Sequence, residues 1–194
     1  MAVNWAVDLA HDLWQITQEK KPVKPVTVRQ NWRPPPSGWC KCNVDAAFDA
    51  NAGQGATAVV LRSDDGSFGG GRARWYPHGL DALMMEAIAC RDGLQFAREK
   101  GVLRLQNEMD CQELVKLWAL GSNQRSYITP IIRDIVEISS GFLDFTLMYA
   151  PRTCNRVAHV LTKQVSDEVR LGEWHIAPTC IDHLVTEECN YVTP

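Results

Sequence analysis

The sequence lacks any long hydrophobic run. No stretch of about 20 apolar residues occurs among its 194 residues, so no membrane-spanning helix is predicted. The first 15 residues contain Asp8, His11 and Asp12 and show no basic start before an apolar run, unlike a secretory signal peptide. No Asn-x-Ser/Thr glycosylation site occurs either. We therefore expect an intracellular protein, nuclear or cytoplasmic, that is not secreted and has no membrane partner.

The sequence also lacks a paired-cysteine motif. Its 7 cysteines are odd in number and irregularly spaced, and no CxxC occurs. This disfavours a zinc ribbon or knuckle and fits a compartment in which thiols stay reduced.

An excess of positive charge is absent as well. Lys and Arg total 20 against 23 Asp and Glu, which gives a net charge of -3. Proteins that bind nucleic acid tightly usually carry a basic surface. Any nucleic-acid site here must therefore be a local patch, and its binding should be weak and salt-sensitive. Hydrophobic residues at 45% and charged residues at 22% are ordinary for a globular domain, and exclude collagen-like and wholly disordered chains.

Prolines separate an N-terminal part from the rest of the chain. Residues 1–19 have apolar residues at helical spacing, but residues 22–25 and 32–39 contain prolines that break helices and inner strands. We expect an N-terminal helix and proline-rich linker over 1–38, a domain over 39–168 and a C-terminal extension over 169–194.

The central part changes from strand to helix periodicity. We expect an α/β fold: a mixed five-stranded sheet, with a three-strand antiparallel meander and two parallel strands, flanked by helices. Strands are predicted at 40–48, 56–62, 68–75, 103–109 and 142–149, and helices at 80–100, 110–120, 129–140, 152–167 and 179–184.

Three carboxylates lie on three different predicted elements. Asp45 is in the first strand, Glu86 in the first turns of a helix, and Asp110 between a strand and a helix. Each has a structural alternative: Asp45 as an edge-strand residue facing water, Glu86 as a solvated helix residue, and Asp110 as a helix N-cap with Glu113. Taken together, three such carboxylates can hold two Mg²⁺ ions, which would activate a water and stabilise a leaving phosphodiester oxygen.

A fourth candidate region runs from 151 to 159. Arg152 and Asn155 lie at a loop-to-helix junction, and His159 follows Asn155 by four residues, on the same helical face. The alternative is a half-buried helix histidine with no ligand.

These motifs resemble a known family. The segments WRPPPSGWCKCNVDAAFDANAGQGATAVVLRSDDG, EAIACRDGLQFAREKG, EMDCQELV and PRTCNRVAHVLTK, between Trp32 and Lys163, resemble type 1 ribonuclease H. They are most similar to the ribonuclease H-like domains derived from plant non-LTR retrotransposons. The resemblance implies a ribonuclease H-like fold and a metal-dependent endonuclease that hydrolyses the RNA strand of RNA–DNA hybrids.

The resemblance also implies roles for single residues. Asp45, Glu86 and Asp110 correspond to the metal-binding carboxylates, with Mg²⁺ as cofactor and Mn²⁺ as an alternative. Asn51 and Gln112 resemble residues that contact the hybrid in its minor groove, where 2′-hydroxyls mark the RNA. Nucleic-acid contacts are expected from Arg152 and Asn155 too. The implied partner is an RNA–DNA hybrid or other nucleic acid, bound by a chain that we expect to be a monomer.

One position departs from the family pattern. Active members have a fourth Asp where this chain has His159, which we still expect at the catalytic site. Imidazole is a poor ligand for Mg²⁺ but acceptable for Mn²⁺. A mobile histidine in the preceding loop and a basic protrusion are also missing. The alternative function is therefore a catalytically weak or inactive domesticated module that binds nucleic acid or protein. A related exonuclease or integrase-like nuclease is a further alternative.

Overall fold

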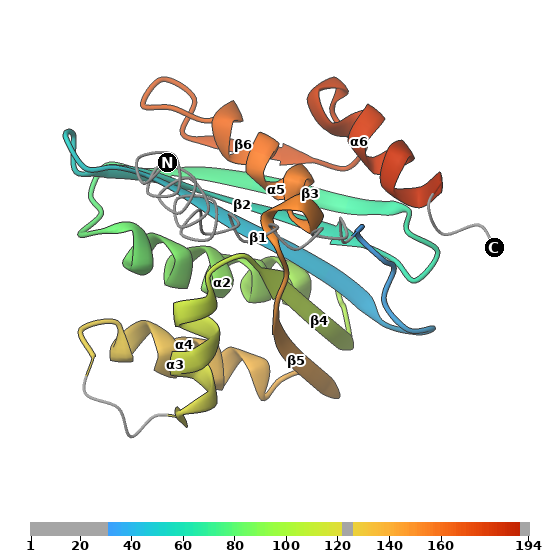
Figure 1. Cartoon of the computed structure of the whole chain (residues 1–194), viewed down its shortest axis with the longest axis horizontal. Helices are drawn as coiled ribbons and strands as arrows, with labels where there is room; N and C mark the ends of the chain where they lie inside the picture. The colour runs from blue at the N-terminus through green and yellow to red at the C-terminus, as the bar shows by residue number, and fades with distance from the viewer. Residues whose placement is uncertain (1–30, 122–125, 191–194) are drawn as a thin grey trace, which may run out of the picture.

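The computed structural model describes residues 31–121 and 126–190 (Figure 1). Its centre is a six-stranded sheet in the order β5-β4-β1-β2-β3-β6. β1 therefore has neighbours on both sides. The strands are β1 Cys40–Asp49, β2 Gln54–Arg62, β3 Phe68–Tyr76, β4 Arg104–Met109, β5 Asp144–Tyr149 and β6 Leu171–Trp174.

The first three strands form the predicted antiparallel meander. β1 pairs with β2, and β2 with β3, through two short turns. The second turn contains the pair Asp65-Gly66. Gly66 has a φ of 85°, which glycine adopts easily, and its N–H donates to the carbonyl of Ser63. β4 then pairs parallel to β1, and β5 parallel to β4. The mixed sheet predicted from the sequence is confirmed.

Helices cover both faces of the sheet. α2, α3 and α4 pack on one face, and α5 and α6 lie on the other, where α5 packs on β1 and β2 (Figure 1). Among the described residues, no helix is both long and apolar enough to cross a membrane. The helices are α2 Ala82–Glu99, α3 Gln112–Ala119, α4 Thr129–Ser139, α5 Arg156–Leu161 and α6 Thr179–Asn190, with short 3-10 turns η2 Arg152–Cys154 and η3 Thr162–Gln164.

Three details differ from the sequence-based expectation. The sheet has a sixth strand, β6, because four half-exposed residues are too few to show an alternating pattern. The helix expected over 152–167 is interrupted: only 156–161 is α-helical, between two 3-10 turns. The last helix continues to Asn190 instead of ending at Leu184. The helix predicted over 1–19 lies outside the described residues.

The packing continues on both sides of the predicted central domain. β6 pairs with β3, and α6 contributes Ile181 and Leu184 to the core beneath α5. At the other end, Trp32 is only 2% exposed and its Nε1 donates to Asn43 Oδ1 at 2.9 Å. The Arg62 guanidinium lies 3.3 Å from the centre of the Trp32 ring. Residues before 39 and after 168 thus pack against the central domain, Trp32 with Ala150 and Cys154, and α6 with α5 and the sheet.

Candidate metal centre and nucleic-acid interface

Asp45 and Asp110 are placed by the register of two parallel strands. Asn43 of β1 lies beside Glu108 of β4, and these two residues are hydrogen-bonded, Asn43 Nδ2 to Glu108 Oε2, at 3.0 Å. Two residues further along each strand are Asp45 and Asp110, on the same face because side chains alternate. β4 ends at Met109, so Asp110 is the first residue after it. This is the carboxyl end of the strand, where α/β folds commonly place their sites.

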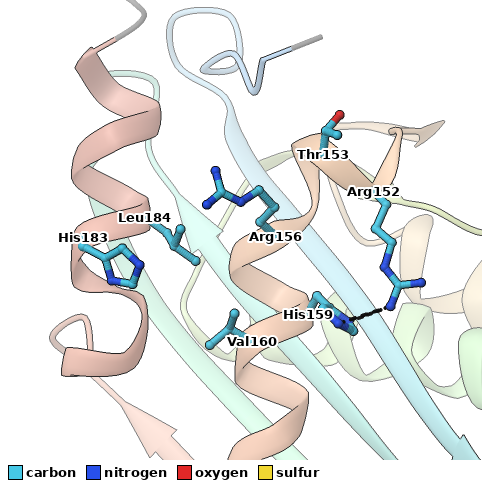
Figure 2. Close-up of a pocket in the computed structure, with 7 residues that line it drawn as sticks. All are labelled: Arg152, Thr153, Arg156, His159, Val160, His183 and Leu184. Carbon is cyan, nitrogen blue, oxygen red and sulfur yellow. Dashed lines mark hydrogen bonds between the residues drawn. The ribbon is translucent and has the colours of Figure 1, made fainter. Parts of the chain in front are cut away.

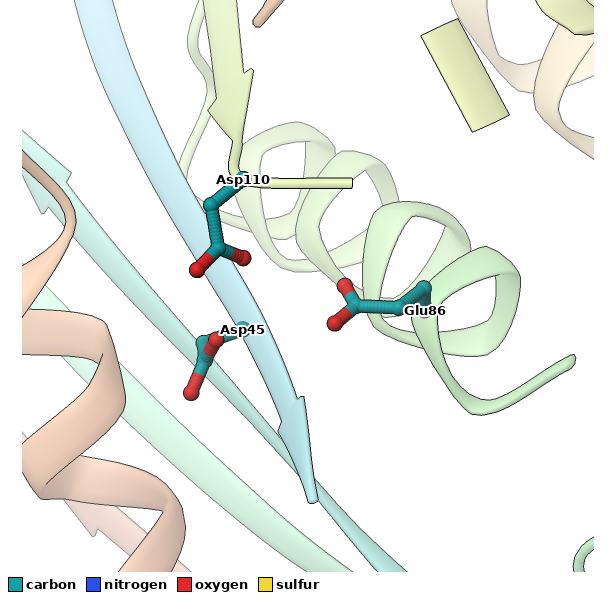
Figure 3. A group of neighbouring side chains, drawn as sticks. All are labelled: Asp45, Glu86 and Asp110. Carbon is teal, nitrogen blue, oxygen red and sulfur yellow. The ribbon is translucent and has the colours of Figure 1, made fainter. Parts of the chain in front are cut away.

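Glu86 is brought to the same point by close packing of α2 against the meander. A Cβ on Gly93 would lie 2.6 Å from Val44, and a Cβ on Gly55 would lie 2.7 Å from Met85. Only glycine permits these approaches without displacing a neighbour. They hold α2 against β1 and β2, and Glu86, next to Met85, projects past the end of β4 toward Asp45 (Figure 3).

The three carboxylates form a single cluster. Asp45, Glu86 and Asp110 each offer an oxygen, and these oxygens lie within 4.8 Å of one another (Figure 3). Asp45 is 3% exposed on a central strand, so its structural alternative as a water-facing edge residue is wrong. The capping alternative for Asp110 is also wrong, because Cys111 is the N-cap of α3 and has no side-chain capping bond.

Burial and mutual repulsion change how these acids ionise. Burial raises the pKa of Glu86 from 4.5 to about 9, and the nearby Asp45 and Asp110 carboxylates add to this rise. Burial also raises the pKa of Asp45, although the hydrogen bond with His159 opposes the rise. Without a cation, the cluster therefore retains protons at pH values where isolated carboxyl groups are ionised.

His159 contacts the most buried member of the cluster. Its Nδ1 lies 3.0 Å from Asp45 Oδ2. An ionised carboxylate can only accept, so Nδ1 is the protonated nitrogen in that pair. Arg152 also lies against the imidazole, with Nη2 at 3.2 Å from Nε2 and 3.3 Å from Nδ1. His159 is thus a half-buried residue of α5 with Asp45 and Arg152 as its partners, and its place at a catalytic site stays a prediction.

The donor set fits a hard divalent cation. All three clustered groups are carboxylates, the ligands that Mg²⁺ and Mn²⁺ take from proteins. Glu86 Oε2 is buried and has no hydrogen-bond partner among the described residues. An unpartnered buried carboxylate oxygen is costly, and a cation between the three groups would remove that cost. Asp45, Glu86 and Asp110 are the residues that would hold it.

The other predicted contact residues differ in accessibility. Asn51 is exposed in the turn after β1, where its N–H bonds to Asp49 Oδ1 at 2.9 Å, and Gln112 is exposed at the start of α3. Arg152 is exposed beside His159. Asn155 is only 1% exposed, and its Nδ2 donates to the carbonyl of Val44 at 2.8 Å. That bond fixes the start of α5 next to Asp45, so His159 is placed over the carboxylates.

Sequence reasoning missed Thr162. Its hydroxyl lies 3.5 Å from Asp45 Oδ2 and donates to the His159 carbonyl at 2.8 Å. The signal is the spacing: Thr162 follows His159 by three residues, one turn further along the same helical face.

The model of the reverse transcriptase-like family matches residues 43–165, more than half of the chain. The chain belongs to this family. The matched segment includes the three carboxylates and His159, and the resemblance noted from the sequence is confirmed.

Relatives of this reverse transcriptase-like chain include one curated plant protein. A protein of Arabidopsis thaliana named "Putative ribonuclease H protein" is 27% identical over 195 residues, covering 95% of this chain. The chain spans only 30% of the length of that relative.

Solved structures show the same fold. The N-terminal RNase H domain of a Mycobacterium tuberculosis protein matches with a TM-score of 0.61 at 16% identity, covering 68% of this chain and 95% of that one. RNase H1 of Halobacterium salinarum matches with a TM-score of 0.60 at 23% identity, covering 67% and 98%. LC11-RNase H1, solved in complex with an RNA/DNA hybrid, matches with a TM-score of 0.59 at 15% identity, covering 66% and 97%. The reverse transcriptase-like chain therefore has the ribonuclease H-like fold.

Proposed function

We propose that this protein is a metal-dependent endonuclease that hydrolyses the RNA strand of RNA–DNA hybrids. The observation that carries the proposal is the cluster of Asp45, Glu86 and Asp110, whose oxygens lie within 4.8 Å of one another. The family match and the name of the Arabidopsis relative support this activity, and they also support an origin from a plant retroelement. The solved complex of LC11-RNase H1 supports a hybrid as the ligand.

Each clustered side chain has a defined task in this proposal. Asp45, Glu86 and Asp110 would hold divalent ions, with Mg²⁺ as the expected cofactor. When bound, two such ions supply activation of a water and stabilisation of the leaving oxygen of a phosphodiester. The raised pKa of Glu86 means that its proton must leave when a cation is bound. His159 orients Asp45 through Nδ1.

The substrate would lie across the exposed side of this cluster. Arg152 would contact a phosphate, since a guanidinium binds phosphate oxygens in pairs. Asn51 and Gln112 are exposed amides suited to reading 2′-hydroxyl groups, which distinguish RNA from DNA. We expect this binding to be weak, because the net charge of the chain is -3, and to depend on salt, because basic side chains contact the phosphates.

Hybrid cleavage is the direct test. The chain is incubated at low salt with a duplex labelled on either strand, in Mg²⁺ or in Mn²⁺, beside the Asp45→Asn variant. We expect cuts in the RNA strand only, and none with Asp45→Asn. Cleavage by Asp45→Asn at the wild-type rate would show that the site assignment is wrong. Cleavage in Mn²⁺ alone would identify the imidazole of His159 as the reason.

One contact favours a second function. His159 Nδ1 already bonds to Asp45 Oδ2, and an imidazole stands where active members have a fourth carboxylate. A domesticated module that binds nucleic acid with little or no cleavage is consistent with this. Folded protein that binds the hybrid but cuts neither strand in either metal would favour this second function over the first.

A further inference from the structure

A groove lies between α5 and α6, next to the carboxylate cluster. Its volume is about 470 Å³, within the range of small-ligand pockets. Figure 2 shows Arg156 and Val160 of α5 pointing toward His183 and Leu184 of α6, whereas Arg152 and His159 meet on the other side of α5. It is lined by Arg152, Thr153, Arg156, His159, Val160, His183 and Leu184.

The lining combines cationic side chains with an apolar floor. Arg152, Arg156 and His183 are exposed around the groove, whereas Leu184 is buried and Val160 half-buried. No acidic residue is among the lining residues that the structure describes. In a chain of net charge -3, this is a local concentration of basic groups.

The ion pair at the groove is easily exchanged. Arg156 Nη1 lies 3.3 Å from Glu187 Oε2, with side chains 45% and 44% exposed. Exposed pairs of this kind contribute little to stability. An anionic ligand can therefore replace Glu187 as the partner of Arg156 with little loss of protein stability.

The groove is continuous with the proposed active site. His159 belongs to both: it lines the groove, and its Nδ1 bonds to Asp45 Oδ2 at 3.0 Å. Arg152 lies against the same imidazole and lines the groove too. The nucleotides next to the phosphate at the carboxylates would thus lie in the groove.

We propose that this groove binds one nucleotide of the nucleic-acid strand beside the reacting phosphate, an inference that rests on the proposed function. Arg156 holds its phosphate, and the base or sugar lies on Val160 and Leu184. The pairing of a guanidinium group with an apolar floor matches a nucleotide better than a free anion, which would leave the apolar surface unused.

The C-terminal helix is needed for this subsite. His183 and Leu184 come from α6, outside the segment 43–165 matched by the family. The matched segment alone supplies only the α5 side of the groove. Residues 179–190 therefore add substrate contacts from outside the segment that the family matches.

Nucleotide binding can be tested without cleavage. AMP, and separately inorganic phosphate, is titrated in EDTA into the full chain, and the ring resonances of His183 are followed by NMR. We expect AMP to shift His183 at lower concentration than phosphate does. Arg156→Gln should weaken AMP binding about tenfold, the effect of one charge-assisted hydrogen bond. The matched control is Arg133→Gln on α4, an exposed arginine on the opposite face of the sheet, which should bind like wild type.

Hybrid affinity separates this inference from the proposed function. In EDTA, Arg156→Gln should reduce the slope of log affinity against log salt by about one, and Arg133→Gln should not. If the wild type neither binds nor cuts the hybrid, but AMP shifts His183 and Arg156→Gln abolishes the shift, the proposed function fails and the nucleotide site stands. If the hybrid is cut, yet His183 does not respond or Arg156→Gln behaves like wild type in both assays, the nucleotide site is refuted and the function stands.

Discussion

His159 Nδ1 and Asp45 Oδ2 lie 3.0 Å apart, so a helix residue occupies one hydrogen-bonding position of the most buried acid in the cluster. The bond links the last turn of α5 to the middle of β1, a separation of 114 residues. It stabilises the ionised form of Asp45 when no metal is bound. It also competes with any cation for the same oxygen. The identity of residue 159 should therefore set which metals the cluster accepts.

His159→Asp should increase the response to Mg²⁺. A fourth carboxylate adds a hard oxygen ligand, and it also adds repulsion when no ion is present. We expect a lower melting temperature than wild type in EDTA and a larger rise on addition of Mg²⁺, with faster Mg²⁺-supported hybrid cleavage. His159→Asn, similar in size but uncharged, is the control. Equal Mg²⁺ responses in both variants and wild type would contradict a metal-selecting role.

Glu86→Gln should change how stability depends on pH. The pKa of Glu86 is about 9 in the folded protein, against an ordinary 4.5. Between these values the folded state binds a proton that the unfolded state has lost, so metal-free stability falls as pH rises, by at most about 1.4 kcal/mol per unit. Glutamine cannot ionise and removes this contribution.

Urea unfolding in EDTA at pH 5, 7 and 8.5 measures the effect. The wild type should lose more stability than Glu86→Gln across this interval. Parallel pH profiles of the two proteins would mean that Glu86 ionises normally and that the cluster is not desolvated.

Metal binding should release protons. Glu86, whose pKa is about 9, retains a proton in the empty cluster and must lose it to bind a cation. Mn²⁺ should therefore raise the melting temperature more at pH 8 than at pH 6. Asp110→Asn should show a smaller rise at both pH values, because one ligand is missing. A rise that is independent of pH would place the ion elsewhere.

Trp32 should be required for full stability, although it precedes the predicted domain start at Trp39. It is 2% exposed, donates to Asn43 and lies beneath the Arg62 guanidinium. Trp32→Ala should cost about 3–5 kcal/mol, the usual range for a buried tryptophan. Urea unfolding of Trp32→Ala and of the half-buried control Trp39→Ala compares the two sites.

Shortened chains test whether the domain begins at Trp39. A chain that begins at Trp39 should be destabilised about as much as Trp32→Ala, whereas one that begins at Asn31 should retain this contact. Equal stability of the two shortened chains would show that residue 39 is a true start of the domain.

The sheet and its main helices could be read from local patterns. Alternation in β1, the Asp-Gly turn at Gly66 and the helical spacing of α2 each depend on residues close in sequence. β6 could not be read in this way, because a four-residue edge strand is defined by its pairing with β3 rather than by its own pattern. The short length of α5 could not be predicted for a similar reason. The ends of this helix are set by its packing against β1 and α6.

By itself, the sequence determined the chemistry of this protein: three carboxylates in a family order and a histidine where a fourth is usual. Only the tertiary structure decided how they act together. The register of β1 and β4, the glycine contacts of α2 and the Asn155 bond to Val44 bring the acids and His159 together. The groove with Arg156 and His183 depends on α6 folding back onto α5. Contacts between residues so far apart depend on the packing of the whole domain, and no local pattern encodes them.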